Sequence, residues 1–234
     1  MELNTYPLVC TRGVVLYPNQ EIVIDVGRDT SVHAVENAQD NYDKKICLFS
    51  QKELEQENPA TEDIYSVGTL CEIRHIRRFD NFLRVKFRGI KRVKLNKWIN
   101  GSLSDLVEVE ILESEKQDTV EEEALIRMIA DELDRMQGQD RFVTKEIVME
   151  ISKGMGGEFL SDKAVQGLPL DLERKQKYLE TLGVNDRLMM LLQDMAKEKK
   201  MREAEIQINE TEKERIDQGQ KDYYIREKTN VISA

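Results

Sequence analysis

The most constraining feature of the sequence is a pair of adjacent segments with strand-like alternation. Residues 67–79 and 82–95 are separated by Asp80 and Asn81, two residue types that tolerate the backbone angles of a tight turn. In the second segment apolar and basic residues alternate, which places them on opposite faces of a strand. The apolar set is Leu83, Val85, Phe87, Val93 and Leu95, and the basic set is Arg84, Lys86, Arg88, Arg92 and Lys94. The pattern predicts a long β-hairpin in which Gly89 marks a bulge or a close backbone approach.

Shorter apolar runs around this hairpin extend the strand-like pattern over residues 1–114. They cover residues 7–11, 21–26, 45–50 and 103–112. A short helix is expected over 30–38, with Thr30 as its N-cap. The polar segment 51–63 is expected to be an exposed loop.

The periodicity changes to that of helices at Glu113. The four predicted helices begin near Thr119, near 144, near 160 and after Asp171, which is the expected N-cap of the last one. From residue 185 onward the chain is expected to form one helix whose apolar stripe thins after Lys197, so that it projects into solvent. The predicted domains are 1–114, a β-rich lobe; 115–184, a helical lobe; and 185–234, the long helix.

Composition excludes several classes of protein. The net charge is −10 with 34% charged residues, which is a poor match to general nucleic-acid binding. No apolar run approaches the ~18–20 residues that span a bilayer, and the first residues do not resemble a secretory signal. Cys10, Cys47 and Cys71 are far apart and lie in apolar runs, which indicates reduced core thiols in a cytoplasmic protein.

No segment of the sequence predicts catalysis. The glycine-rich residues 153–158 are not followed by the Gly-Lys-Ser/Thr of a phosphate-binding loop, and no G-x-S-x-G is present. His33 and His75 have no ligand-type residues at metal spacing, so neither a metal nor another cofactor is expected in this chain.

The basic residues between 74 and 97 form the one charged patch with a candidate function. With neighbouring aromatics, a nucleic-acid surface is one interpretation of this strand face. The other interpretation, which the acidic whole chain favours, is that the cations pair with carboxylates or keep a sheet face soluble. The candidate nucleic-acid residues are Arg77, Arg78, Arg84, Lys86 and Arg88.

Four stretches, in order along the chain, resemble the amino-terminal domain of the ATP-dependent protease Lon. They are P-L-V-C-T-R-G-V-V-L-Y-P with V-G-R at 26–28, the hairpin V-G-T-L-C-E-I-R-H-I-R-R-F-D-N-F-L-R-V-K-F-R-G-I-K-R-V, the segment L-P-L-D-L-E-R-K-Q-K-Y-L-E-T-L-G-V-N-D-R-L, and Y-Y-I-R-E at 223–227. Cys10, Thr11 and the Asp-Asn turn depart from the usual residues of that family. The Walker motifs and the Ser-Lys peptidase dyad have no counterpart here.

This resemblance implies an α+β fold: a PUA-like β-rich lobe, a helical lobe and a long helix. It implies capture of unfolded or degron-bearing proteins and support of a hexamer. ATP, Mg²⁺ and proteolysis would belong to modules outside this sequence. The last helical stretch carries no stop signal, and we expect it to continue toward an ATPase module.

Binding of unfolded clients requires exposed apolar groups on a scaffold. The candidates are Tyr17 and Pro18 in the first loop and Phe79 and Phe82 beside the hairpin turn. Ordinary packing inside the lobe is the alternative for each. A scaffold that assembles weakly through the long helix, as a loose coiled coil, is a further interpretation.

Overall fold

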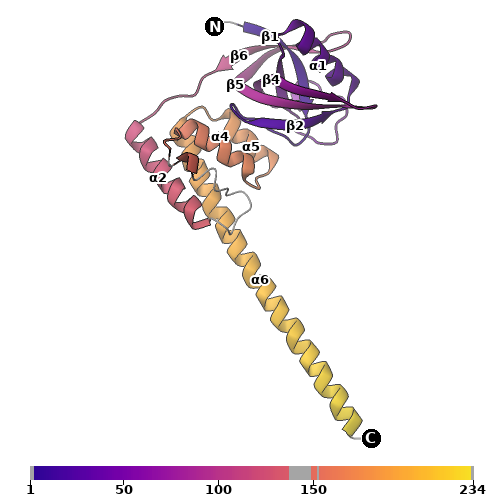
Figure 1. Cartoon of the computed structure of the whole chain (residues 1–234), viewed down its shortest axis with the longest axis vertical. Coiled ribbons are helices and arrows are strands. Elements are labelled where there is room, and N and C mark those ends of the chain that lie inside the picture. Colours follow the sequence, from indigo (N-terminus) through magenta and orange to yellow (C-terminus); the bar gives the residue numbers. More distant parts are fainter. Residues whose placement is uncertain (1–2, 137–148, 152, 233–234) are drawn as a thin grey trace. The chain divides into compact units, whose positions relative to one another are not determined.

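A computed structural model describes residues 3–136, 149–151 and 153–232; among these, the side chains of residues 3, 217, 219 and 221–232 are not described (Figure 1). The chain divides into two compact units, residues 1–191 and 192–234. The first unit contains all six strands and most of the helices, and the α+β class is confirmed. The boundaries predicted near residues 114 and 184 both fall inside this first unit.

The six strands form one sheet that closes on itself. They are β1 (Leu3–Thr11), β2 (Glu21–Val26), β3 (Lys45–Ser50), β4 (Val67–Arg78), β5 (Leu83–Ile99) and β6 (Leu106–Leu112). Their order is β2-β5-β4-β3-β1-β6, and β6 also pairs with β5. Five strands therefore make a closed ring, and β2 lies outside this ring, paired with the first residues of β5. All pairs are antiparallel except β1 with β3.

The long strand β5 pairs with two different strands along its length, and a bulge separates the two paired segments. Residues 83–88 pair with β2, and residues 92–99 pair with β6. Along β4 the register jumps, because Cys71 pairs with Gly89 but Leu70 pairs with Lys91. The extra residue reverses which face each later side chain occupies.

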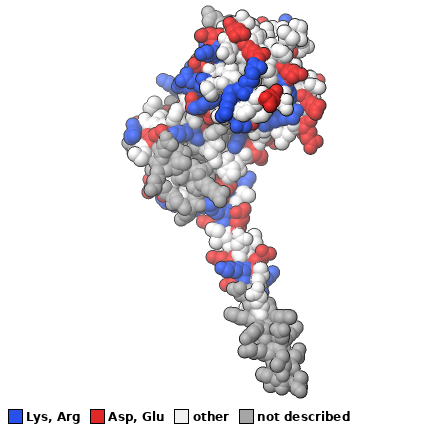
Figure 2. Space-filling model, turned by 45° about the vertical axis from the view of Figure 1, so that its right-hand side comes forward, with Lys and Arg blue, Asp and Glu red and all other residues white. Residues whose placement is uncertain are grey.

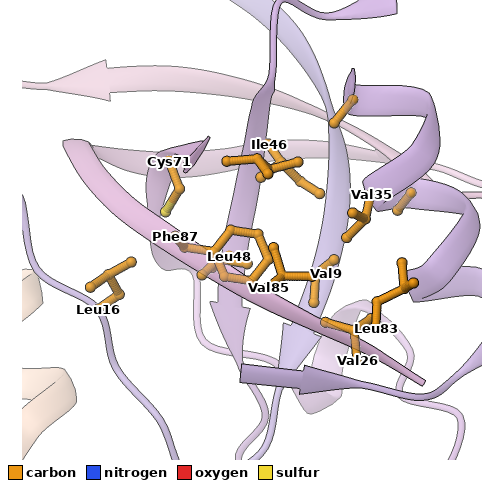
Figure 3. Close-up of a cluster of buried hydrophobic side chains, with 13 residues drawn as sticks. Val9, Leu16, Val26, Val35, Ile46, Leu48, Cys71, Leu83, Val85 and Phe87 are labelled. Carbon is orange, nitrogen blue, oxygen red and sulfur yellow. The ribbon is translucent and has the colours of Figure 1, made fainter. Parts of the chain in front are cut away.

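Two apolar clusters occupy the two faces of these strands. Figure 3 shows the first, to which Val85 and Phe87 of β5 and Val35 of helix α1 (Asp29–Asn41) all belong. The second draws on every strand of the ring: Leu8, Cys47, Phe49, Leu70, Val93, Val107 and Val109. The hairpin alternation is confirmed for the residues before Gly89, which join the first cluster, whereas Val93 joins the second.

The remaining helices follow the strands. They are the short 3-10 helix η1 (Thr61–Asp63), then α2 (Thr119–Met136), α4 (Gly157–Gly167), α5 (Leu172–Glu180) and α6 (Val184–Ile232). The helix predicted near 144–153 lies mostly outside the described residues. No helix within the described ranges is long and apolar enough to cross a membrane.

Helix caps were predicted with mixed success. Asp171 does cap α5, since its carboxylate accepts the N–H of Arg174 at 2.7 Å. The Thr30 prediction is wrong, because α1 already begins at Asp29 and the cap residue is Arg28, whose side chain makes no capping hydrogen bond. At α2 the cap is Asp118, whose carboxylate accepts the N–H groups of Val120 and Glu121.

The second unit continues α6 from residue 192. Its apolar side chains Met201, Ile206, Ile208 and Ile216 are all more than half exposed. This confirms the prediction that the helix is mostly solvated over its described side chains.

Candidate functional site: an aromatic pair at the hairpin tip

The turn between β4 and β5 brings two aromatic side chains together. The N–H of Phe79 donates to the carbonyl of Phe82 at 2.9 Å, closing a turn over Asp80 and Asn81. The two rings stack with centroids 4.7 Å apart and planes 12° from parallel. Both side chains are half-buried. The pair is therefore held by strand geometry while part of its apolar surface stays open to solvent.

Two arginines frame this pair. The guanidinium carbon of Arg77 lies 5.1 Å from the centre of the Phe79 ring, and that of Arg84 lies 5.3 Å from it. Arg84 also lies 5.7 Å from the Phe82 ring. Cations over aromatic faces stabilise such an arrangement and keep it rigid. We call Arg77, Phe79, Phe82 and Arg84 the hairpin tip.

The neighbouring strand β2 fixes the position of Arg84. Its Nε and Nη2 each donate to a carboxylate oxygen of Asp25 at 2.7 Å. This two-bond pair lowers the pKa of Asp25 and raises that of Arg84, in both cases first through the hydrogen bond itself. The Arg84 side chain is thereby aimed across the aromatic pair.

Tyr17 and Pro18 do not belong to this surface. Tyr17 has no exposed area, and its hydroxyl donates to the carbonyl of Lys175 in α5 at 2.7 Å. Burial raises the pKa of Tyr17 well above its ordinary value. Pro18 is buried where it pairs with Gly89. The expectation that the first loop presents these two residues to solvent is wrong, because the loop folds back between β5 and α5.

The structure also places the two pairs of predicted site residues, Tyr17 with Pro18 and Phe79 with Phe82, near opposite ends of β2. Pro18 precedes the start of β2, where Glu21 pairs with Arg88, while Phe82 precedes Leu83, which pairs with Val26 at its end. A strand of this length covers about 20 Å. The hairpin tip alone therefore remains as the candidate apolar site.

Most cations of the basic strand face are neutralised locally. Figure 2 shows Lys and Arg side chains interspersed with Asp and Glu over the β-rich part. Among the five nucleic-acid candidates, Arg78 pairs with Glu36, Arg84 with Asp25, and Lys86 with Glu21 at 2.6 Å. Arg77 and Arg88 form no ion pair with any residue whose side chain is described. The carboxylates come from the β-rich lobe itself and leave little free positive charge.

Arg92 was predicted on the solvent face and is instead almost fully buried, at 2% exposure. Its guanidinium reaches the carboxylate of Asp162 in α4, and Arg187 of α6 lies against the same carboxylate. The bulge after Gly89 turns this part of β5 toward the helices. The one sequence signal for Arg92 was its place in the hairpin stretch that resembles the Lon family.

The described residues offer no assembled metal site. No group of three or more His, Cys, Asp or Glu side chains within the described ranges is placed to hold a metal ion. Cys47 and Cys71 are buried free thiols, which confirms their assignment to the core, and Cys10 is a half-buried free thiol.

The fold and the candidate site define a β-rich binding module joined to helices. A family model described as "ATP-dependent protease La (LON) substrate-binding domain" matches residues 5–197. The chain therefore belongs to the family of Lon substrate-binding domains, as the sequence resemblance indicated.

Similar proteins and solved structures agree with this assignment. The chain is 34% identical over 235 residues to a Lon protease of Syntrophomonas wolfei, and 31% identical over 227 residues to one of Brevibacillus choshinensis. These alignments cover 99% and 97% of this chain but 29% of each relative. The chain thus spans less than a third of the length of these relatives. An N-terminal domain of a Mycobacterium avium complex Lon protease has the same fold, with a TM-score of 0.67 at 19% identity, over 82% of this chain and 98% of that one.

Proposed function

We propose that the hairpin tip captures exposed apolar segments of unfolded or degron-bearing proteins. The observation that carries this proposal is the stacked, half-buried Phe79–Phe82 pair at the end of a hairpin. An unfolded chain offers mainly apolar side chains and free backbone, and the solvent-accessible part of the two half-buried aromatic rings is complementary to such side chains.

The preorganisation of the pair supports the same function. The rings are already stacked and framed by Arg77 and Arg84, so little side-chain freedom is lost when a client segment binds. Because the contact is apolar, it would accept many sequences. A protein that screens unfolded clients needs this tolerance.

The rest of the machinery is part of the proposal. Since the relatives are about three times longer, we propose that this chain delivers clients to an ATPase and a Ser-Lys peptidase elsewhere in the same protein. ATP and Mg²⁺ would bind there, and not to the chain described here. Assembly into a hexamer and a cytoplasmic location belong to the same proposal.

The test compares single Phe79→Ala and Phe82→Ala variants with the parent chain. Binding of a fluorescent, reduced and carboxymethylated lactalbumin is measured by anisotropy. Each variant should bind about tenfold more weakly, the effect of losing one well-placed aromatic contact. The free energy of unfolding should fall by only ~1 kcal/mol, since each side chain is half exposed and contributes mainly the stacking contact.

The matched control is Leu103→Ala, which removes an apolar side chain that is 65% exposed in the loop before β6. Binding should be unchanged in this control. Parent-like affinity in both phenylalanine variants would remove the hairpin tip as the client site.

A further inference from the structure

One edge of β2 has no strand beside it among the described residues. β2 stands at the end of the strand order and pairs only with β5. An unpaired strand edge presents N–H and C=O groups that can receive another extended chain.

The register shows which peptide groups face this edge. The N–H of Gly89 donates to the carbonyl of Gln20 at 2.9 Å. In an antiparallel pair, hydrogen-bonded positions alternate, so Ile22 and Ile24 direct their peptide groups toward β5. Glu21, Val23 and Asp25 therefore direct theirs toward the free edge.

Several of the usual protections of an edge strand are missing from β2. Natural edges carry lysine and other charged side chains, proline or bulges that discourage pairing. β2 contains neither lysine nor proline, and its carboxylates Glu21 and Asp25 are held by Lys86 and Arg84. Val23, between them, is 54% exposed.

We propose that an extended segment of the client adds to β2 as a further strand. This inference rests on the proposed function and specifies how the client is held. β2 ends where Val26 pairs with Leu83, the residue that follows Phe82. An added strand would therefore run beside β2 with one end at the hairpin tip, so that backbone hydrogen bonds supply affinity and the aromatic pair supplies the apolar contact.

Charge defines the preferred client more closely. Arg88 of β5 faces Glu21 at the start of β2, and Arg77 of β4 lies across Arg84 from Asp25, two strands from β2 and near its other end. Both are exposed and neither forms an ion pair with a described side chain. The preferred occupant is an extended apolar segment with acidic residues at its ends, and basic ends should weaken its binding.

The experiment removes one outward N–H from the edge. Val23→Pro deletes this donor and places a ring where the added strand would lie, whereas Val23→Thr keeps both the N–H and the branched shape. The probe is a fluorescent peptide of alternating valine and threonine with aspartate at both ends, measured by anisotropy with the full chain. Val23→Pro should lower affinity about tenfold or more through the lost hydrogen bond and the clash, while Val23→Thr should remain within about twofold.

A second measurement does not depend on the stability of the proline variant. The same peptide with alternate backbone amides methylated should bind the parent chain about tenfold more weakly, because it cannot complete the ladder. A peptide with lysine ends should also bind more weakly than the one with aspartate ends, and the difference should shrink with salt.

The outcomes separate this inference from the proposed function. If Phe82→Ala weakens binding but Val23→Pro and peptide methylation do not, the hairpin tip binds clients and the strand addition is overturned. If none of the changes weakens binding, the proposed function fails as well. If the chain is a dimer that Val23→Pro converts to a monomer without changing peptide affinity, the edge is occupied by a second copy and the inference is overturned.

Discussion

Arg92 of β5 and Asp162 of α4 form a buried ion pair with two hydrogen bonds, of 3.0 and 2.5 Å, across 70 residues of sequence. Neither residue is more than 2% exposed. The Nε of Arg92 also donates to the carbonyl of Leu179 at 3.1 Å. Arg187 donates to the carbonyls of Thr181 and Leu182 and approaches the same carboxylate. This cluster joins the long strand of the β-rich part to three helices.

Arg92→Met is therefore expected to destabilise the fold strongly. It leaves the Asp162 carboxylate buried without its main partner, which typically costs about 3–5 kcal/mol. Urea unfolding of the parent and the variant measures the difference. The control Arg88→Met, an exposed arginine on the same strand, should change stability by no more than about 0.5 kcal/mol. Equal stability of the two variants would show that the ion pair does not stabilise the contact between β5 and the helices.

Gly89→Ala is expected to be poorly tolerated. A Cβ at this position would lie 2.2 Å from the carbonyl oxygen of Tyr17, which is backbone and cannot rotate away. The first loop would have to leave β5, with a loss of about 3 kcal/mol in the free energy of unfolding. Gly156→Ala is the control, because nothing lies within 4 Å of a Cβ there. Thermal melting of both variants checks the prediction, which fails if the two curves coincide.

Tyr17→Phe tests the contact between the first loop and α5. The variant keeps the ring but leaves the Lys175 carbonyl without its 2.7 Å donor. A loss of about 1 kcal/mol in the free energy of unfolding is expected from urea unfolding, because a part-buried hydrogen bond is removed. Client binding should not change, since Tyr17 is buried. Weaker peptide binding at unchanged stability would show that Tyr17 does contribute to the client site.

The thiol of Cys10 is expected to react slowly in the folded chain. Burial raises its pKa to about 12, against an ordinary value of 9.0. The raised pKa means that the thiol's contribution to stability is complete below pH 9 and is lost as the pH rises toward 12. A Cys47→Ala/Cys71→Ala chain should react with Ellman's reagent at pH 8 at least ~100-fold more slowly folded than unfolded in urea. Comparable rates in the two states would contradict the assigned burial.

The basic strand face is expected not to bind nucleic acid appreciably. Three of its five candidate cations are held by carboxylates of the same lobe. A mobility shift with mixed-sequence single-stranded RNA should show no complex at micromolar concentration in about 0.15 M salt. A complex that weakens steeply with salt, and that the charge reversals Arg77→Glu and Arg88→Glu abolish, would establish the alternative function.

Local sequence patterns predicted most of the secondary structure because they report contacts between near neighbours. The alternation of residues 83–88 holds for a strand with one apolar face, and Asp171 caps a helix through a bond to a residue three positions away. Phe79 and Phe82 were found as site candidates for the same reason, since a tight turn brings them together. Tyr17 and Arg92 were placed wrongly because their partners, Lys175 and Asp162, are far away in the sequence.

The sequence by itself determined the class of the fold, the hairpin, the presence of helices after the last strand, and the family. These depend on periodicity, turn residues and motifs that local chemistry sets. Only the tertiary structure decided that β5 closes a ring through the bulge at Gly89, and that this bulge turns Arg92 inward to Asp162. It also left β2 as an open edge beside the hairpin tip. A one-residue change of register moves every later side chain to the other face, and that change depends on how distant strands pair.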